Sequence, residues 1–141
     1  MKTIIYAPPS AGCENSARVL ASAITPALRP RGARVMQMRF PSEMRAATLA
    51  RHHSASMEVD CAFFMERVVD HPALMRAEHR ILIPNPEWLD PPTRRLAANC
   101  THVWHKSHFS LNRLRPLFPK AQHAYLEAHV NSIREVLGGT E

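Results

Sequence analysis

Residues 80–84 read Arg-Ile-Leu-Ile-Pro, which is the clearest strand signal in the sequence. A short apolar run that stops at a proline is typical of a strand buried on both faces of a sheet. Similar or weaker runs occur at residues 3–7, 33–40, 61–65, 101–105 and 124–126. Helices are predicted between and after them, at residues 16–28, 42–52, 71–78, 93–98, 109–117 and 131–137. This alternation predicts an α/β fold, a single Rossmann-like three-layer sandwich with a mostly parallel sheet of five to six strands.

The composition agrees with one globular domain. The chain has 141 residues, of which 45% are apolar and only 4 are glycine. A chain of this length buries roughly 70% of its unfolded surface, and its composition excludes disordered and fibrous classes. No apolar run approaches the roughly 18–20 residues of a membrane span, and the first apolar stretch is too short for a signal peptide. We therefore expect a cytoplasmic protein without a membrane span.

The charge balance is basic, with 18 Lys and Arg residues against 12 Asp and Glu residues and a formal net charge of +6. Arginine, which supplies most of this charge, suits phosphate and carboxylate partners. The arginines are scattered along the sequence and form no block, so a solvated basic surface is the preferred interpretation. A nucleic-acid partner is disfavoured because only 6% of the residues are aromatic.

The cysteines and histidines predict neither a disulfide framework nor a metal site. Cys13, Cys61 and Cys100 are odd in number, widely spaced and without a C-x-x-C pair, so buried free thiols are expected. Histidines at positions 102, 105 and 108 lie three residues apart on an extended segment, where they would face opposite sides and not converge on one metal. The other histidines, His123 among them, are expected on polar surfaces.

The loops after the strands are the candidate site, because ligands of doubly wound sheets bind beyond the carboxyl ends of the strands. The first of these loops supplies Ser10, Gly12 and Asn15 as candidate ligand-binding residues, since the N-terminus of the following helix favours an anion. Asn15 or Ser16 is the expected helix cap. An ordinary strand-to-helix turn is the alternative. The loop has neither G-x-G-x-x-G nor G-x-x-x-x-G-K-[ST], which disfavours a usual dinucleotide fold and a P-loop.

The most distinctive loop follows the strand at residues 80–84. Two prolines stiffen it and fix Asn85 and Glu87, so that Asn85 could bind hydroxyl groups and Glu87 could act as a catalytic general base. The alternative is that Asn85 caps a turn and Glu87 makes a surface ion pair. Beyond the strand at residues 101–105, Lys106 and Ser107 are placed to meet an anionic ligand.

The string Ile-Pro-Asn-Pro-Glu-Trp at residues 83–88, followed by a strand that ends in Lys106-Ser107, is similar to a known arrangement. A small-residue loop, a helix and the pattern L-x-x-R-G-x-x-V at residues 28–35 precede it. Together they resemble the N-terminal domain of GT-B-fold glycosyltransferases over residues 3–126. The resemblance implies that this domain holds a sugar or lipid-linked acceptor, while a C-terminal domain holds a nucleotide-sugar donor.

The resemblance also implies that the loop carrying Ser10, Gly12 and Asn15, together with Asn85, Glu87 and Lys106, lines the acceptor side of the cleft. The sequence holds no donor-binding half. We therefore expect a subunit, fragment or remnant that needs a separate donor-binding half for sugar transfer and has no cofactor of its own. Its expected partner is a donor-domain subunit or a second copy of the chain. The alternative is a free-standing Rossmann-like module that binds a nucleotide or other small anionic ligand without catalysis.

Overall fold

The computed structural model describes residues 2–7, 11–29, 34–39, 58–70 and 72–125. The helices predicted at residues 42–52 and 131–137 lie outside these ranges, as do Ser10 and the side chain of Trp88. Within the described ranges, no helix has both the length and the apolar character needed to cross a membrane.

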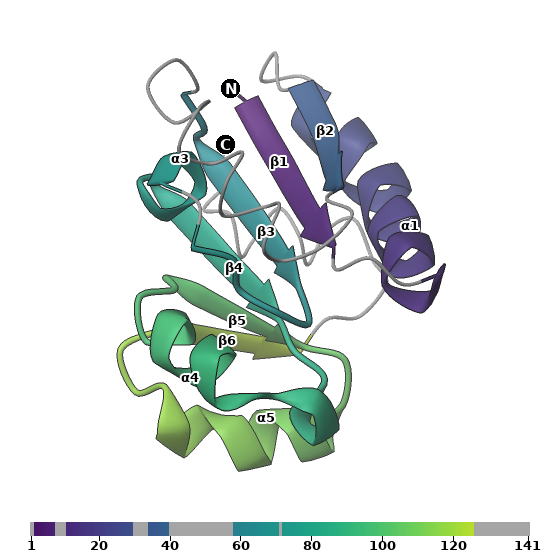
Figure 1. Cartoon of the computed structure of the whole chain (residues 1–141). Coiled ribbons are helices and arrows are strands. Elements are labelled where there is room, and N and C mark those ends of the chain that lie inside the picture. Colours follow the sequence, from purple (N-terminus) through teal and green to yellow (C-terminus); the bar gives the residue numbers. More distant parts are fainter. Residues whose placement is uncertain (1, 8–10, 30–33, 40–57, 71, 126–141) are drawn as a thin grey trace.

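One six-stranded sheet forms the centre of the molecule (Figure 1). Its strands are β1 (Lys2–Ala7), β2 (Arg34–Arg39), β3 (Cys61–Met65), β4 (His79–Ile83), β5 (His102–His105) and β6 (Gln122–Tyr125). Every neighbouring pair is parallel, and the order is β2-β1-β3-β4-β5-β6. The predicted α/β fold with a parallel sheet is confirmed. The direction of strand addition reverses between β1 and β3, which makes the carboxyl ends of these two strands the topological switch point.

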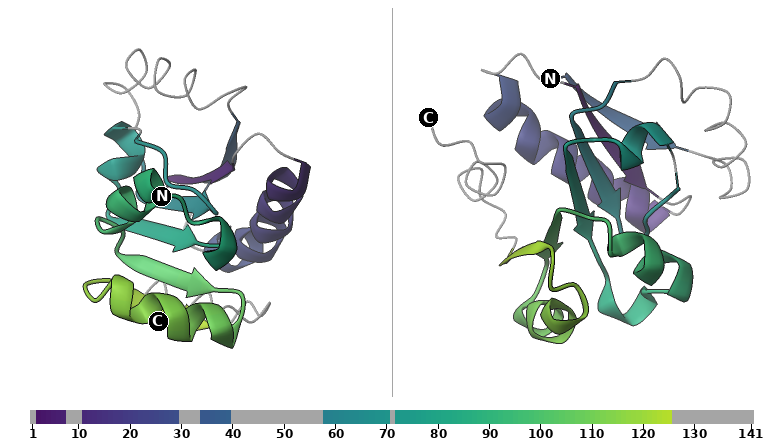
Figure 2. Two further views of the ribbon diagram at one scale, coloured as in Figure 1. Left: turned by 60° about the horizontal axis from the view of Figure 1, so that its bottom comes forward. Right: turned by 90° about the vertical axis from the view of Figure 1, so that its left-hand side faces the viewer.

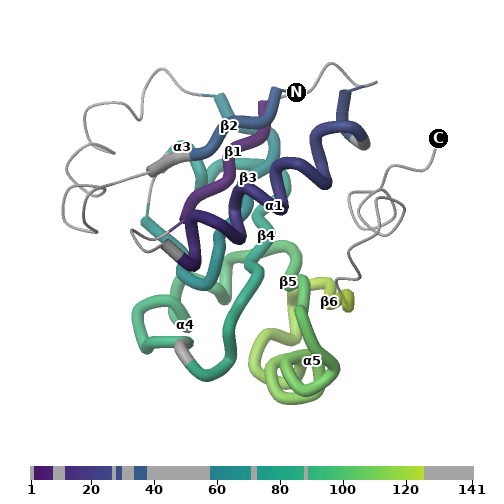
Figure 3. Tube along the Cα trace, turned by 90° about the vertical axis from the view of Figure 1, so that its right-hand side faces the viewer, coloured from purple at the N-terminus to yellow at the C-terminus, as the bar shows by residue number. Residues whose placement is uncertain are grey.

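Helices cover both faces of the sheet (Figures 1 and 2). The helical segments are α1 (Ala11–Leu28), α3 (Pro72–Met75), η2 (Pro86–Trp88), α4 (Pro91–Ala97), α5 (His108–Leu114) and η3 (Arg115–Leu117). Figure 3 shows α1 lying across β1 and β3. The opposite face carries α3, α4 and α5. Because successive side chains of a strand point to opposite faces, each strand contributes side chains to two separate hydrophobic cores.

The two cores are covered by different helices. Ile4 and Tyr6 of β1 belong to the core beneath α3, α4 and α5, whereas Ile5 and Ala7 belong to the core beneath α1. All four side chains are buried. The expected burial of the three cysteines is confirmed, and all three are free thiols.

The first helix begins at Ala11 rather than at Ser16, so the prediction that Asn15 or Ser16 caps it was wrong. The apolar stripe of α1 extends one turn further than expected, because Cys13 is buried against the sheet in line with Ala17, Leu20 and Ile24. Burial of the thiol thus draws the preceding residues into the helix and places Asn15 in its second turn.

Candidate functional site

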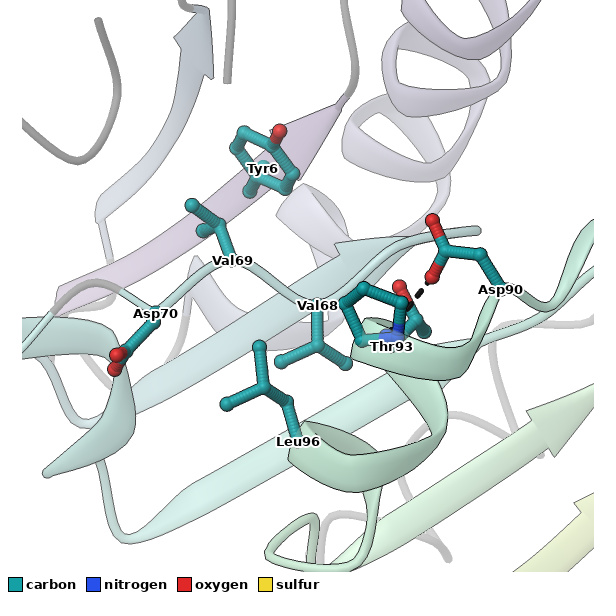
Figure 4. A pocket seen from close by; sticks show the side chains of 8 residues that line it. Tyr6, Val68, Val69, Asp70, Asp90, Thr93 and Leu96 are labelled. Carbon is teal, nitrogen blue, oxygen red and sulfur yellow. Dashed lines mark hydrogen bonds between the residues drawn. The ribbon is translucent and has the colours of Figure 1, made fainter. Parts of the chain in front are cut away.

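A cavity of about 170 Å³ opens at the carboxyl edge of the sheet, beside the switch point (Figure 4). Tyr6, near the end of β1, forms one side of it. The loop after β3 supplies Val68, Val69 and Asp70, and the segment after β4 supplies Asp90, Pro92, Thr93 and Leu96. The segments after two strands, β3 and β4, therefore meet here, as expected for a site built from the loops after the strands.

The lining combines apolar walls with a few oxygen atoms. Val68, Val69 and Leu96 give aliphatic contact, and the Tyr6 ring is almost fully buried. A cavity of about 150 Å³ is known to hold a benzene ring, so this one has room for a single small ring. The carboxylates at its border suit hydroxyl donors better than another anion.

Asp90 is a fixed acceptor at the border of the cavity. Its Oδ1 accepts a hydrogen bond of 2.8 Å from the backbone N–H of Thr93, which makes Asp90 the N-cap of α4. Its Oδ2 lies 3.9 Å from Nε of Arg67. Partial burial opposes ionisation, but the hydrogen bonds from Thr93 and the charge of Arg67 outweigh it and hold the pKa of Asp90 below its usual value. Asp90 is therefore a carboxylate at neutral pH.

Asn85 and Glu87, predicted as site residues, lie on the same segment but do not line this cavity. Oδ1 of Asn85 accepts a hydrogen bond of 3.3 Å from the backbone N–H of Glu87 and caps η2. Asn85 thus has the capping role that the sequence left open as an alternative. The Glu87 side chain is exposed, and within the described part of the chain its carboxylate has no ion-pair partner.

A second polar group lies at the carboxyl edge on the α1 side of the sheet. Sγ of Cys13 donates to Oε2 of Glu66 over 3.0 Å, and Nζ of Lys106 lies 3.9 Å from Oε1 of the same carboxylate. Glu66 has a positive φ of 65°, and the next N–H, of Arg67, bonds back to the carbonyl of Met65. A non-glycine residue in this region carries strain that often accompanies function.

Of these three residues, only Lys106 was predicted from the sequence as a site residue; Cys13 and Glu66 were not. Glu66 directly follows β3, so its place after a strand was the available signal. Cys13 lies between the candidates Gly12 and Asn15, but nothing in the sequence pairs it with Glu66, which is 53 residues away. The hydrogen bond and the ion pair connect the first turn of α1, the loop after β3 and the turn after β5.

The other predicted residues have separate places. Gly12 and Asn15 are exposed in the first turns of α1. A Cβ added at Gly12 would meet no atom within 4 Å among the described residues, so the space beside this turn is open. Ser107 caps α5, with its Oγ accepting from the backbone N–H of Ser110 over 3.1 Å.

The contact between His105, which is buried, and His123, which is half-buried, was not predicted from the sequence. His105 Nε2 lies 2.8 Å from Nδ1 of His123, and His105 Nδ1 lies 2.8 Å from Oγ of Ser110. His123 Nε2 is 2.8 Å from the carbonyl of Phe118, which can only accept. With both rings neutral, His123 must donate to Phe118, His105 to His123, and Ser110 to His105. His123, expected on a polar surface, is half-buried because β6 pairs with β5 and brings it beside His105.

The environment keeps His105 neutral. Burial lowers its pKa to about 4, with the neighbouring His123 and Arg115 acting in the same direction. Among the described residues, no three His, Cys, Asp or Glu side chains are grouped as metal ligands would be.

The chain matches no protein-family model, no curated protein and no solved structure. The fold and the site define its class as a Rossmann-like parallel α/β protein with a small cavity at the carboxyl edge of the sheet.

Proposed function

We propose that this protein binds a hydroxyl-rich acceptor at the carboxyl edge of its sheet, as the acceptor-side half of a glycosyltransferase-type enzyme. A separate donor-binding half, on another domain or chain, completes the reaction. The observation that carries the proposal is the cavity between Tyr6, Val69 and Thr93, because it lies where doubly wound sheets bind ligands and has room for one small ring. Its apolar walls and carboxylate border suit a sugar ring.

In this proposal Glu87 is the general base that takes the proton of the acceptor hydroxyl. Its carboxylate is exposed and unpaired within the described residues, and the cap at Asn85 holds its backbone. Asp90 and Thr93 follow a few residues later on the same segment and border the cavity. A ring bound there would have to extend toward η2 to reach Glu87, since Glu87 does not line the cavity.

The second candidate is a free-standing module that binds a nucleotide or other small anion without catalysis. The open space beside Gly12 and the ammonium group of Lys106 favour it. Such a ligand would occupy the α1 side of the carboxyl edge, near the Glu66 carboxylate, rather than the cavity near Thr93. The two candidates therefore differ in place as well as in ligand charge.

Filling the cavity tests the first candidate. We expect a compound from a panel of sugars, sugar phosphates and nucleotide sugars to raise the melting temperature. At a hundredfold excess over Kd, binding should increase the free energy of unfolding by about 2.7 kcal/mol. Val69→Phe fills the cavity and should abolish this shift. Val19→Phe, the same change at an exposed position on α1, should leave it intact.

The result separates the candidates. Loss of the shift in Val69→Phe alone supports binding in the cavity. If a nucleotide raises the melting temperature of Val69→Phe as it does that of the wild type, but not that of Lys106→Ala, the result would favour the anion-binding module. No shift with any compound in the panel would count against both.

A further inference from the structure

The positive charge of the molecule is concentrated at one end of the sheet. Residues 91–125, which comprise α4, β5, α5, η3 and β6, contain six Lys and Arg residues and no Asp or Glu. The rest of the chain holds the other twelve Lys and Arg residues and all twelve Asp and Glu residues. The formal charge of this one stretch, +6, therefore equals the formal net charge of the whole chain. The arginines form no block in the sequence, but the absence of acidic residues among them makes a basic region in the fold.

The outer surface of α5 and η3 combines this charge with exposed apolar side chains. Phe109 is 60% exposed and Leu117 is 45% exposed, which are high values for large apolar residues. The Arg113 guanidinium lies over the Phe109 ring at 5.8 Å. Arg115 and Lys120 are also exposed on the same stretch of chain. We call these five exposed residues of positions 109–120 the basic face.

We propose that the basic face docks on the surface of an anionic lipid bilayer. Phe109 and Leu117 would enter the boundary between headgroups and acyl chains, and Arg113, Arg115 and Lys120 would contact the lipid phosphates. Peripheral membrane surfaces combine these two kinds of side chain. Residues 91–125 supply six cations and no acidic residue to this contact, although the exposed Glu87 stands on η2, which packs against α5.

The shape and chemistry of the basic face favour a bilayer over other anionic partners. A nucleic-acid strand gains its stacking energy from aromatic side chains, and an exposed leucine adds nothing to that. The helix α5 lies on the outside of the molecule, at the end opposite β2 (Figures 1 and 2). A protruding helical surface can meet a flat bilayer without any change of fold.

Co-sedimentation with vesicles tests the proposal on the full chain. We expect binding to vesicles of phosphatidylcholine mixed with phosphatidylglycerol, and much weaker binding to phosphatidylcholine alone. Each cation near an anionic surface contributes about fivefold to binding, so Arg113→Gln, Arg115→Gln and Lys120→Gln together should weaken it by about a hundredfold. Salt at about 1 M should release the protein, because it shortens the Debye length to about 3 Å.

The matched control removes three exposed arginines from the other end of the sheet, through Arg18→Gln, Arg29→Gln and Arg34→Gln. This variant has the same net charge as the first and should still bind. Equal loss in both variants would show that only the net charge matters and would overturn the proposal. An unchanged melting temperature verifies that both variants are folded.

The apolar contribution has its own pair of variants. Phe109→Ser should weaken binding several-fold at constant charge, and Val19→Ser, at an exposed site on α1, should not. Equal binding to neutral and anionic vesicles, or no binding to either, would overturn the proposal. Retention of an oligonucleotide or an acidic protein in place of vesicles would do the same.

Discussion

Glu66 and Glu87 both follow strands at the carboxyl edge, yet the fold gives their carboxylates opposite surroundings. Glu66 is fixed by the Cys13 thiol and lies near the Lys106 ammonium group. Glu87 is exposed, and among the described residues only its backbone is held, by the cap at Asn85. A carboxylate with no internal partner can accept a proton from a bound hydroxyl without first breaking a hydrogen bond. This difference is the reason for assigning the base role to Glu87.

Glu87→Gln should abolish sugar transfer by the chain reconstituted with a donor-binding half. Loss of a general base lowers the rate by about 10²–10⁴-fold, whereas removing an exposed, unpaired charge leaves stability nearly unchanged. Product formation and the melting temperature are the two readouts. Glu78→Gln, at an exposed site near the amino end of β4, is the control and should affect neither. A clear fall in the melting temperature of Glu87→Gln would identify Glu87 as a structural residue instead.

Individual site residues could be predicted only where the loop itself carries the signal. The two prolines around Asn85 indicated a fixed turn, and the structure has Asn85 as its cap. The contact between Cys13 and Glu66 could not be predicted, because it depends on how α1 is placed against β3. Tyr6 and Thr93 were missed for the same reason, since only the sheet brings them to one cavity.

The buried histidine chain connects three neighbouring elements. His105 belongs to β5, Ser110 to α5 and His123 to β6, and the chain ends at the carbonyl of Phe118 after η3. All these bonds form with both rings neutral, and a protonated His105 would keep them by donating to the oxygen of Ser110. The cost of protonating His105 is instead that of a charge in a buried position near His123 and Arg115, which is why its pKa is low.

Acid should therefore weaken the fold through His105. Its pKa lies at about 4 in the folded protein, below the ordinary value of 6.5. The unfolded chain binds a proton as pH falls through 6.5, while the folded protein does not until about pH 4. The stabilisation is thus complete above pH 6.5 and is lost between these values, by about 3 kcal/mol in all and about 2 kcal/mol by pH 5.

Urea unfolding of wild type and His105→Asn at pH 7 and pH 5 measures the contribution of His105 to the free energy of unfolding. Between the two pH values, the free energy of unfolding of the wild type should fall by about 2 kcal/mol more than that of the variant. His108→Asn, at an exposed neighbouring histidine, should behave like the wild type. Equal losses in wild type and His105→Asn would show that the acid sensitivity arises elsewhere, in the carboxylates.

Elements with strong local patterns were predicted well. The strand at residues 61–65 has the predicted bounds, and a strand at the position of β6 was expected although it is short and only partly buried. The start of α1 was misplaced, because the burial of Cys13 is a tertiary effect. Pro26 lies inside that helix, where a proline usually kinks or ends it, yet α1 continues to Leu28. Leu28 is buried in the core beneath the helix, and this packing offsets the missing hydrogen bond.

On the scale of the whole molecule, the sheet separates two functional regions. The cavity lies near the centre, beside the switch point between β1 and β3, and the basic face lies on α5 and η3 at the β6 end. The turn at Lys106 and Ser107 joins the end of β5 to the start of α5, so the basic region extends from the carboxyl edge. The parallel fold could be predicted from strand and helix alternation. The lack of Asp and Glu in residues 91–125 can also be counted in the sequence, but the strand order that places this stretch at one end of the sheet could not be predicted.

The most direct measurement for the proposed site is amide NMR of the ¹⁵N-labelled protein, titrated with the compound of the panel that stabilises it most. Binding at the carboxyl edge predicts that the shifted amides lie in residues 66–70 and 90–96, with Val69→Phe removing the shifts. The groove between α1 and β2, lined by Arg18, Arg29 and Gln37 among others, should be unaffected. Shifts confined to that groove, or no shifts with any compound, would contradict a ligand site at the carboxyl edge.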